Sequence, residues 1–194
     1  IVGFITQPLP IGGVSIVVIT VAALTGTLKI SEGISGFANS AIWLIVGAFL
    51  FSRGFIKTGL GKRIAYNLIS AFGSSSLRLA YALALSDLIL APATPSNTAR
   101  VGGVIMPITT SLAKAFGSEP QNGPRKIGSF LMQSIYQVNT ITSAMFQTSM
   151  AGNTLVAALA LQSFGIGITW GDWAMAAIVP GIIALIIMPY FIYK

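Results

Sequence analysis

Long apolar runs separated by short polar segments dominate the chain. The three longest runs cover residues 11–28, 41–56 and 173–193. Each approaches the ~20 residues that a helix needs to cross a bilayer. A polar loop (29–33) follows the first run, and a basic stretch (53–63) closes the second. The pattern predicts an all-α polytopic membrane protein.

Shorter apolar segments lie between these runs. Residues 64–72 are too few to cross and predict an interfacial helix. Residues 79–93 and 101–113 are the arms of a hairpin (77–115) joined by residues 94–100. The second arm reaches only about 20 Å, against a hydrocarbon core of ~30 Å. This favours a re-entrant hairpin whose tip stops inside the membrane, with two short crossings and an external loop as the alternative.

A second interrupted helix covers residues 127–164. Gly152-Asn153-Thr154 breaks it about 18 Å from Gly165 at helical rise, close to the middle of the bilayer. Asn153 is expected to cap the half-helix that follows, although a packing kink is the alternative. The polar run 133–143 is expected to line a cytoplasmic-facing cavity, or else to face other helices.

Composition narrows the function classes. Hydrophobic residues make up 54% of the chain and charged residues 8%, so a compact soluble domain could not cover its surface. Histidine and cysteine are absent, which excludes imidazole and thiolate metal sites and histidine-based triads. Four acids remain, too few for an all-carboxylate metal site: Glu32, Asp87, Glu119 and Asp172. We therefore expect no enzyme and no resident cofactor.

Basic residues give a predicted topology. Most of the eleven Lys and Arg residues lie in 53–78, in 114–126 and at Lys194, whereas Lys29 and Asp172 lie at the opposite ends of the segments. Basic residues concentrate in the cytoplasmic loops of membrane proteins. The regions 53–78 and 114–126 and Lys194 are therefore expected on the cytoplasmic side. This distribution explains the net charge of +7 without a nucleic-acid partner.

The hairpin tip, Pro95-Ser96-Asn97-Thr98, carries small hydrogen-bonding side chains. Ser, Asn and Thr are good N-caps, and a helix N-terminus attracts anions. Broken helices whose N-termini meet at the midplane are how transporters hold anionic substrates. The tip and the 152–154 break are therefore predicted to be two walls of one site, with a turn cap that binds nothing as the alternative.

Two charged residues lie inside the hairpin. Asp87 is about 12 Å below the tip along the arm, so an ion pair with Arg100 is expected to be geometrically poor. Asp87 is expected to pair elsewhere or to act in gating or proton transfer. Arg100 is expected near the midplane with no acid placed to offset it, as a fixed cation for charge compensation or coupling.

Longer stretches resemble the divalent anion/sodium symporter family, in particular its citrate/succinate and 2-oxoglutarate/malate translocators. The stretches that carry the resemblance are Trp43-Leu44-Ile45, Lys57-Thr58-Gly59-Leu60-Gly61-Lys62-Arg63, Leu90-Ala91-Pro92-Ala93-Thr94-Pro95-Ser96-Asn97-Thr98-Ala99-Arg100, Thr142-Ser143-Ala144-Met145-Phe146, Met150-Ala151-Gly152-Asn153 and Trp170-Gly171-Asp172-Trp173. Together they cover nearly the whole chain.

The resemblance implies a transporter of two inverted repeats, each with a hairpin tipped by Ser-Asn-Thr, and usually a homodimer. It implies that Asn97 and Thr98 contact a substrate carboxylate. It also implies a sodium site at Ser96, Asn97 and Gly152. This chain departs from the family where the break lacks the common Pro-Pro-Asn and where Pro92 offers no hydroxyl. Both departures weigh against sodium coordination.

The expected function is transmembrane transport of di- or tricarboxylates by alternating access, through substrate exchange. Sodium-coupled dicarboxylate symport is the alternative, and a non-transporting membrane subunit is a weaker one. The expected substrate-binding residues are Ser96, Asn97, Thr98, Gly152, Asn153 and Thr154. Residues 1–194 are expected to be one membrane domain and the first repeat, in which 1–9 end a truncated helix. The expected location is a bacterial inner membrane or a plastid inner envelope, and the expected partners are lipid, the missing C-terminal half and a second copy.

Overall fold

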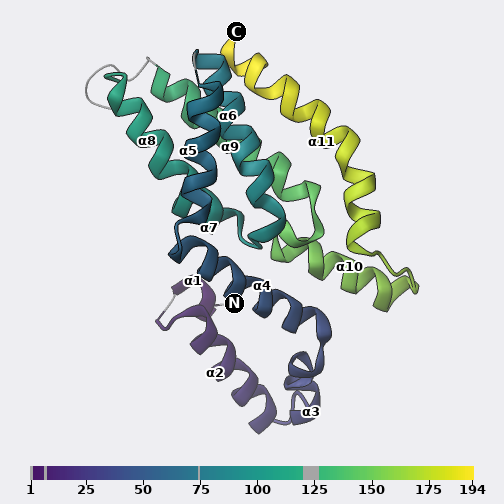
Figure 1. The fold of residues 1–194 in the computed structure, drawn as a ribbon. Coiled ribbons are helices and arrows are strands. Elements are labelled where there is room, and N and C mark those ends of the chain that lie inside the picture. Colours follow the sequence, from purple (N-terminus) through teal and green to yellow (C-terminus); the bar gives the residue numbers. More distant parts are fainter. Residues whose placement is uncertain (1, 7, 74, 120–126) are drawn as a thin grey trace. The chain divides into compact units, whose positions relative to one another are not determined.

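The computed structural model describes residues 2–6, 8–73, 75–119 and 127–194, which form helices and turns without a β-strand (Figure 1). The all-α prediction is confirmed for these residues. The chain divides into two compact units, Ile1–Trp43 and Leu44–Lys194. Arg125 and Lys126, which the charge pattern assigns to the cytoplasmic side, lie outside the described residues.

The first unit contains α1 (Val2–Thr6), α2 (Ile11–Leu24), α3 (Ile30–Gly33) and the 3-10 turn η1 (Ser35–Ala38). Its main helix, α2, ends at Leu24 rather than at residue 28, since Gly26 adopts a left-handed φ of 70°. The polar loop after it forms α3, where the Lys29 N–H donates to Glu32 Oε2 over 3.2 Å.

Helices α4 (Ser40–Lys57) and α5 (Leu60–Phe72) are joined at Gly59, whose φ of 71° lets the chain turn. In α5, Gly61 and Ala65 are buried, whereas Lys62 and Arg63 are exposed. This helix is longer than the predicted 64–72 but still too short to cross a bilayer. One face packs on α6 and the other carries charge, which suits an interfacial helix.

The central helix of the second unit is α9 (Ile127–Met145). It contacts α6 (Ser76–Leu90), α8 (Met106–Ala115) and α11 (Trp170–Tyr193) (Figure 1). Apolar side chains from α5, α6, α8, α9 and the helical segment just before α8 fill the core: Ala65, Leu79, Leu83, Ile105, Ile108 and Leu131. The hairpin and the broken helix are therefore held against each other by ordinary apolar packing.

The hairpin consists of α6 and a second arm that runs through α7 (Asn97–Arg100), the π-helical η3 (Val101–Ile105) and α8. Both arms have their outer ends at the end of the second unit where the C-terminus lies (Figure 1). The second arm is helical from Asn97 to Ala115, about 28 Å long. The predicted arm of 101–113 is therefore too short, because its helix begins at the tip itself. Arm length consequently gives no argument for a re-entrant hairpin.

Two described helices are long and apolar enough to cross a bilayer: Ser76–Ala93, which includes α6, and Trp170–Tyr193, which is α11. The predicted run 173–193 is thus confirmed as a helix. On α11, Ile178, Ile183 and Ile187 are among many exposed apolar side chains. Only lipid or another apolar surface accommodates such a helix at low free-energy cost.

Candidate functional site

The hairpin tip is built by a cap on its second arm. Ser96 has an extended backbone, and its Oγ accepts the Ala99 N–H over 3.2 Å. Asn97 Oδ1 accepts the N–H of Thr98 over 2.8 Å. The predicted N-capping by the tip is confirmed, and it engages two of the N–H groups at the start of the helix.

Other polar groups of the tip are left without a strong partner. Thr98 is exposed, and its hydroxyl has only a long contact of 3.4 Å to Asn97 Oδ1. The Asn97 Nδ2 group donates to no acceptor among the described residues. The tip therefore offers an amide and a hydroxyl to a ligand.

The broken helix is interrupted earlier than the sequence predicts. Helix α9 ends at Met145, Phe146 is extended, the 3-10 turn η4 (Gln147–Ser149) follows, and α10 (Ala151–Phe164) begins after Met150. Gly152, Asn153 and Thr154, predicted to be the break, lie inside α10. A glycine and an asparagine are tolerated in the first turn of a helix, so their presence located the break only approximately.

Side chains around the break replace the helical hydrogen bonds that it loses. Asn153 Nδ2 donates to the carbonyl oxygens of Ser143 (2.7 Å) and Phe146 (2.9 Å). The single hydroxyl proton of Ser149 is shared between the same two carbonyls, and Thr154 Oγ1 donates to that of Gln147. The prediction that Asn153 caps the following half-helix is wrong. Its side chain instead satisfies the carbonyl end of the preceding one.

The hairpin tip and the break lie against each other. The Ala151 N–H donates to the Pro95 carbonyl over 3.1 Å, and Thr148 Oγ1 donates to the Pro92 carbonyl over 2.8 Å. These bonds join segments more than fifty residues apart in the chain. The two interruptions are therefore neighbours, as predicted, whereas their role as two walls of one binding site stays a prediction.

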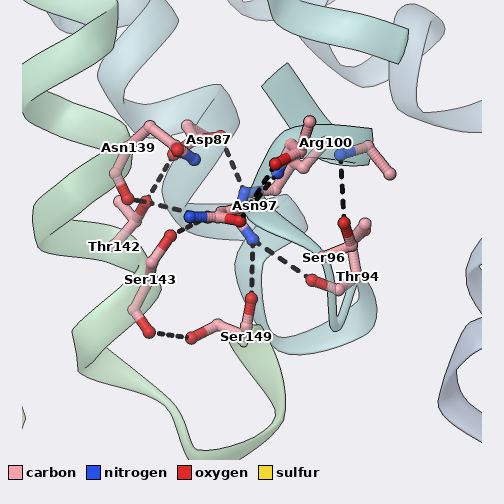
Figure 2. A network of polar contacts seen from close by, with 11 residues as sticks. Asp87, Thr94, Ser96, Asn97, Arg100, Asn139, Thr142, Ser143 and Ser149 are labelled. Carbon is pink, nitrogen blue, oxygen red and sulfur yellow. Dashed lines mark hydrogen bonds and ion pairs between the residues drawn. The ribbon is translucent and has the colours of Figure 1, made fainter. Parts of the chain in front are cut away.

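Arg100 lies at the centre of this junction, with 0% of its surface exposed (Figure 2). Its Nε donates to Asp87 Oδ1 over 2.8 Å, and its Nη1 donates to the carbonyls of Thr94 and Ser149, each at 3.2 Å. Its Nη2 donates to Thr142 Oγ1 (3.2 Å) and Ser143 Oγ (3.0 Å). All five donors of the guanidinium are engaged.

Asp87 is buried with Arg100 and balances its charge. Its Oδ2 accepts from Thr142 Oγ1 and, over 3.4 Å, from Asn139 Nδ2. The prediction of a poor Asp87–Arg100 geometry is wrong, as is the expectation that no acid offsets Arg100. The two arms are antiparallel and the arginine lies one helical turn past its cap, so the two side chains lie at the same level of the hairpin.

Polar residues of α9 divide between its two faces. Ser134, Thr142 and Ser143 are buried within the unit. Gln133, Tyr136 and Thr140 are exposed at helical spacing on the other face. The exposed face of α9 is polar, whereas the exposed surface of α11 is apolar. A polar face of this kind needs water or polar groups opposite it.

Helix α11 supports the break from the other side. Trp170 Nε1 donates to Thr148 Oγ1 over 3.0 Å, and the Trp170 ring stacks on Phe146 with a centroid distance of 5.8 Å. Trp173 Nε1 donates to the carbonyl of Ala144 over 2.9 Å. Gly181 leaves room for Met145, whose side-chain atoms would lie within 2.7 Å of an added Cβ. The break therefore lies beside the N-terminal half of α11.

Three cavities of the second unit lie away from the hairpin tip. One of about 330 Å³ is lined by Thr110, Lys114, Ser129 and Met132 at the outer ends of α8 and α9. Two others flank Tyr81 and Leu85 on α6. No group of three or more acids among the described residues could hold a metal ion.

The whole chain, residues 1–194, matches the family described as "Sodium:sulfate symporter transmembrane region". It is 58% identical to the "Putative malate transporter YflS" of Bacillus subtilis (strain 168) and 50% identical to "Dicarboxylate transporter 1, chloroplastic" of Spinacia oleracea. It is 38% identical to the "L-tartrate/succinate antiporter" of Escherichia coli (strain UTI89 / UPEC). All three alignments cover 100% of this chain, and they cover 41%, 34% and 44% of the respective relatives.

The chain therefore belongs to the sodium:sulfate symporter family and is an integral membrane protein. The family and these relatives are transporters and not enzymes, in agreement with the expectation from composition. The chain spans less than half the length of these relatives.

Several residues of the junction have partners that the local sequence does not predict. Thr94 and Ser149 act through their carbonyl groups, which every residue has. Asn139 and Thr142 belong to the polar run 133–143, and Thr142 also to a stretch that carries the family resemblance, but neither feature pairs them with Asp87. Their role follows from a partner fifty residues away. Asp87, an acid within an apolar arm, is the sequence feature that indicates a buried polar partner nearby.

Proposed function

We propose that this chain is the first of two inverted repeats of a transporter for di- or tricarboxylates that works by alternating access. The observation that carries the proposal is the hairpin tip, which abuts the α9–α10 break: there Asn97 Nδ2 has no acceptor among the described residues, and the Thr98 hydroxyl has only a long contact of 3.4 Å. Relatives named as malate, dicarboxylate and tartrate/succinate transporters support the substrate class. The second repeat would supply the other wall of the site.

The proposed roles follow the local chemistry. Asn97 Nδ2 and Thr98 Oγ1 donate to a substrate carboxylate, and Ser96 holds the tip in shape as its cap. Gly152, Asn153 and Thr154 support the site from the break, because the side chains of the latter two bind backbone carbonyls there. Hydrogen bonds from the Asn97 amide and the Thr98 hydroxyl would be stronger to a charged carboxylate than to a neutral acceptor.

We propose that the hairpin is re-entrant. Arg78 near the start of α6 and Lys114 near the end of α8 place basic residues at both outer ends, as a shared cytoplasmic side requires. The tip contacts a break that lies beside α11 between Trp170 and Gly181, and so within the length of a helix able to cross the bilayer. Substituted-cysteine labelling of Thr98→Cys from either side of sealed vesicles tests this. Labelling only through the substrate pathway, and slowed by substrate, is expected. Rapid labelling from outside that substrate does not affect would indicate two full crossings.

The exposed polar face of α9 supports an aqueous pathway. Gln133, Tyr136 and Thr140 lie along it, leading from the outer end of the helix toward the break. A face of this kind is costly against lipid and suits either water or the polar surface of the second repeat.

For the mode of transport, we propose substrate exchange, with sodium-coupled symport as the alternative. The Escherichia coli relative is named an antiporter, whereas the family description names a sodium symporter. A sodium site at Ser96, Asn97 and Gly152 would need oxygen ligands, and Pro92 contributes no hydroxyl to it. Arg100 does not serve as an unpaired cation in this proposal, since Asp87 balances its charge.

The test is uptake of radiolabelled dicarboxylate by the full-length protein in proteoliposomes, with and without internal dicarboxylate and with and without a sodium gradient. If the protein exchanges substrates, uptake should require internal dicarboxylate and should not change with the sodium gradient. Sodium-driven uptake into empty vesicles would establish symport instead. No saturable uptake in any arm would contradict transport of this substrate class.

The remaining expectations complete the proposal. The partners are the second repeat, the lipid bilayer and a second copy in a homodimer. The membrane is a bacterial inner membrane, with a plastid inner envelope as the alternative, since relatives include a bacterial "Inner membrane protein YbhI" and chloroplastic transporters.

A further inference from the structure

We propose that Arg100, held by Asp87, is a positioning residue that locks the hairpin tip to the α9–α10 break and so holds the exposed polar groups of the tip in place. The inference rests on the proposed function only in that the tip is taken to bind the substrate. The locking itself is a property of the fold.

The bonds of Arg100 reach every segment of the junction. Asp87 belongs to α6, the Thr94 carbonyl to the tip, Thr142 and Ser143 to α9, and the Ser149 carbonyl to η4 (Figure 2). One planar group therefore links the first arm, the tip, the end of α9 and the break. Removing it would leave several buried polar atoms without partners at once.

Arginine is suited to this role and lysine is not. The guanidinium offers five donors in a fixed planar fork, whereas an ammonium offers three from one point. At this position a lysine could keep the ion pair with Asp87 but could not also reach both carbonyls and both hydroxyls. The number of segments tied together depends on the guanidinium and not only on the charge.

Two further bonds bypass Arg100, from Ala151 N–H to the Pro95 carbonyl and from Thr148 Oγ1 to the Pro92 carbonyl. The first places backbone of the tip against backbone at the start of α10, and the second ties a side chain of η4 to the backbone just before the tip. If Arg100 keeps this contact closed, a covalent bond there should not hinder transport.

The first experiment measures protection of the tip without using transport. Thr94 is 2% exposed and contributes only its carbonyl to Arg100, so Thr94→Cys in a cysteine-free full-length protein reports opening of the tip. Arg100→Gln is expected to raise the rate of maleimide labelling about tenfold or more, because charge-assisted hydrogen bonds are lost. Arg100→Lys is expected to raise it by a smaller factor, and Arg63→Gln, at an exposed arginine of α5, not at all. Labelling of the Lys or Gln variant at the unsubstituted rate would overturn the proposal.

A double variant separates positioning from simple charge balance. Asp87→Asn with Arg100→Gln removes both charges and leaves no unpaired ion. If Asp87 and Arg100 only balance each other's charge, the double variant should label Thr94→Cys as slowly as the protein with both charges. That result would overturn the proposal. If the fork of donors holds the tip, labelling stays fast and the KM for exchange stays raised while the protein remains folded, as we expect.

The second experiment tests whether this contact stays closed during exchange. This chain has no cysteine, and Pro95→Cys with Ala151→Cys places a pair across the contact described above. Disulfide formation with exchange flux within about twofold of the reduced protein is expected. Flux that oxidation abolishes and reduction restores would show that the tip and the break must separate, and would overturn the proposal. A protein that exchanges no carboxylate in any form would contradict the proposed function instead, and the labelling result would still decide the locking.

Discussion

Arg100 and the pair Asn97 and Thr98 lie in the same helical turn at the hairpin tip, yet their environments are opposite. Arg100 is fully buried and every N–H of its guanidinium is engaged. Thr98 is exposed, and the Asn97 amide nitrogen has no acceptor in the described part of the chain. In so apolar a protein, a polar side chain is costly unless it is paired. The turn therefore separates groups that hold the fold from groups that remain for a ligand, and the face of the helix decides which is which.

Removing the acid on the buried side should have the largest effect on stability. Asp87→Asn leaves the buried Arg100 without its counter-charge, which typically costs about 3–5 kcal/mol. We expect a strongly lowered unfolding temperature for the purified full-length protein in detergent. Asp172→Asn, at an exposed acid that binds the Thr169 N–H, is the control and should lower it much less. Similar drops in unfolding temperature for both variants would show that the buried Asp87–Arg100 pair contributes no more to stability than an exposed acid.

Substitutions on the exposed side should affect binding and leave stability alone. Asn97→Ala and Thr98→Ala each remove a donor to a charged acceptor, about 1.5–3 kcal/mol, or one to two decades of affinity. Dicarboxylate binding by calorimetry measures this loss, and an unchanged unfolding temperature is expected. Thr110→Ala is the control, since that hydroxyl bonds only to the Met106 carbonyl of its own helix. Full affinity in both tip variants would show that the tip is only a turn.

A smaller effect is expected where α11 supports the junction. Gly181→Ala would place a Cβ within 2.7 Å of Met145 at the end of α9, and overpacking typically costs about 1–3 kcal/mol. We expect a lower unfolding temperature and faster labelling of Thr94→Cys. In Gly171→Ala, on the same helix, the added Cβ lies 3.8 Å from Thr169 Oγ1 and should change neither.

The smallest expected effect comes from a single hydrogen bond beside the break. Trp173→Phe removes the indole donor to the Ala144 carbonyl, typically about 0.5–1.5 kcal/mol, while keeping an aromatic ring. A small drop in unfolding temperature with unchanged substrate affinity is expected. A loss of affinity comparable to that of the tip variants would place Trp173 within the binding site.

Local sequence was sufficient for those features that depend on neighbouring residues. The apolar run at 173–193 predicted α11, because length and hydropathy are properties of one segment. The caps at the tip were predictable for the same reason, since Ser96 bonds to Ala99 within one turn. The break was predicted but misplaced by a few residues. Asn153 stabilises it from inside the next helix, at carbonyls seven and ten residues away.

Tertiary structure alone decided which polar residues are partners. Counted along the arm, Asp87 is far from the tip, and so from Arg100. Antiparallel arms, however, bring a residue before the turn level with one after it. The arginine side chain then reaches from one arm to the other. The exposed and buried faces of α9 likewise became distinct only once α6, α8 and α11 covered parts of it. A sequence shows that polar groups are present in an apolar chain and therefore need partners. The packing of helices distant in sequence determines whether the partner is inside the fold or is a ligand, because pairing depends on separation in space.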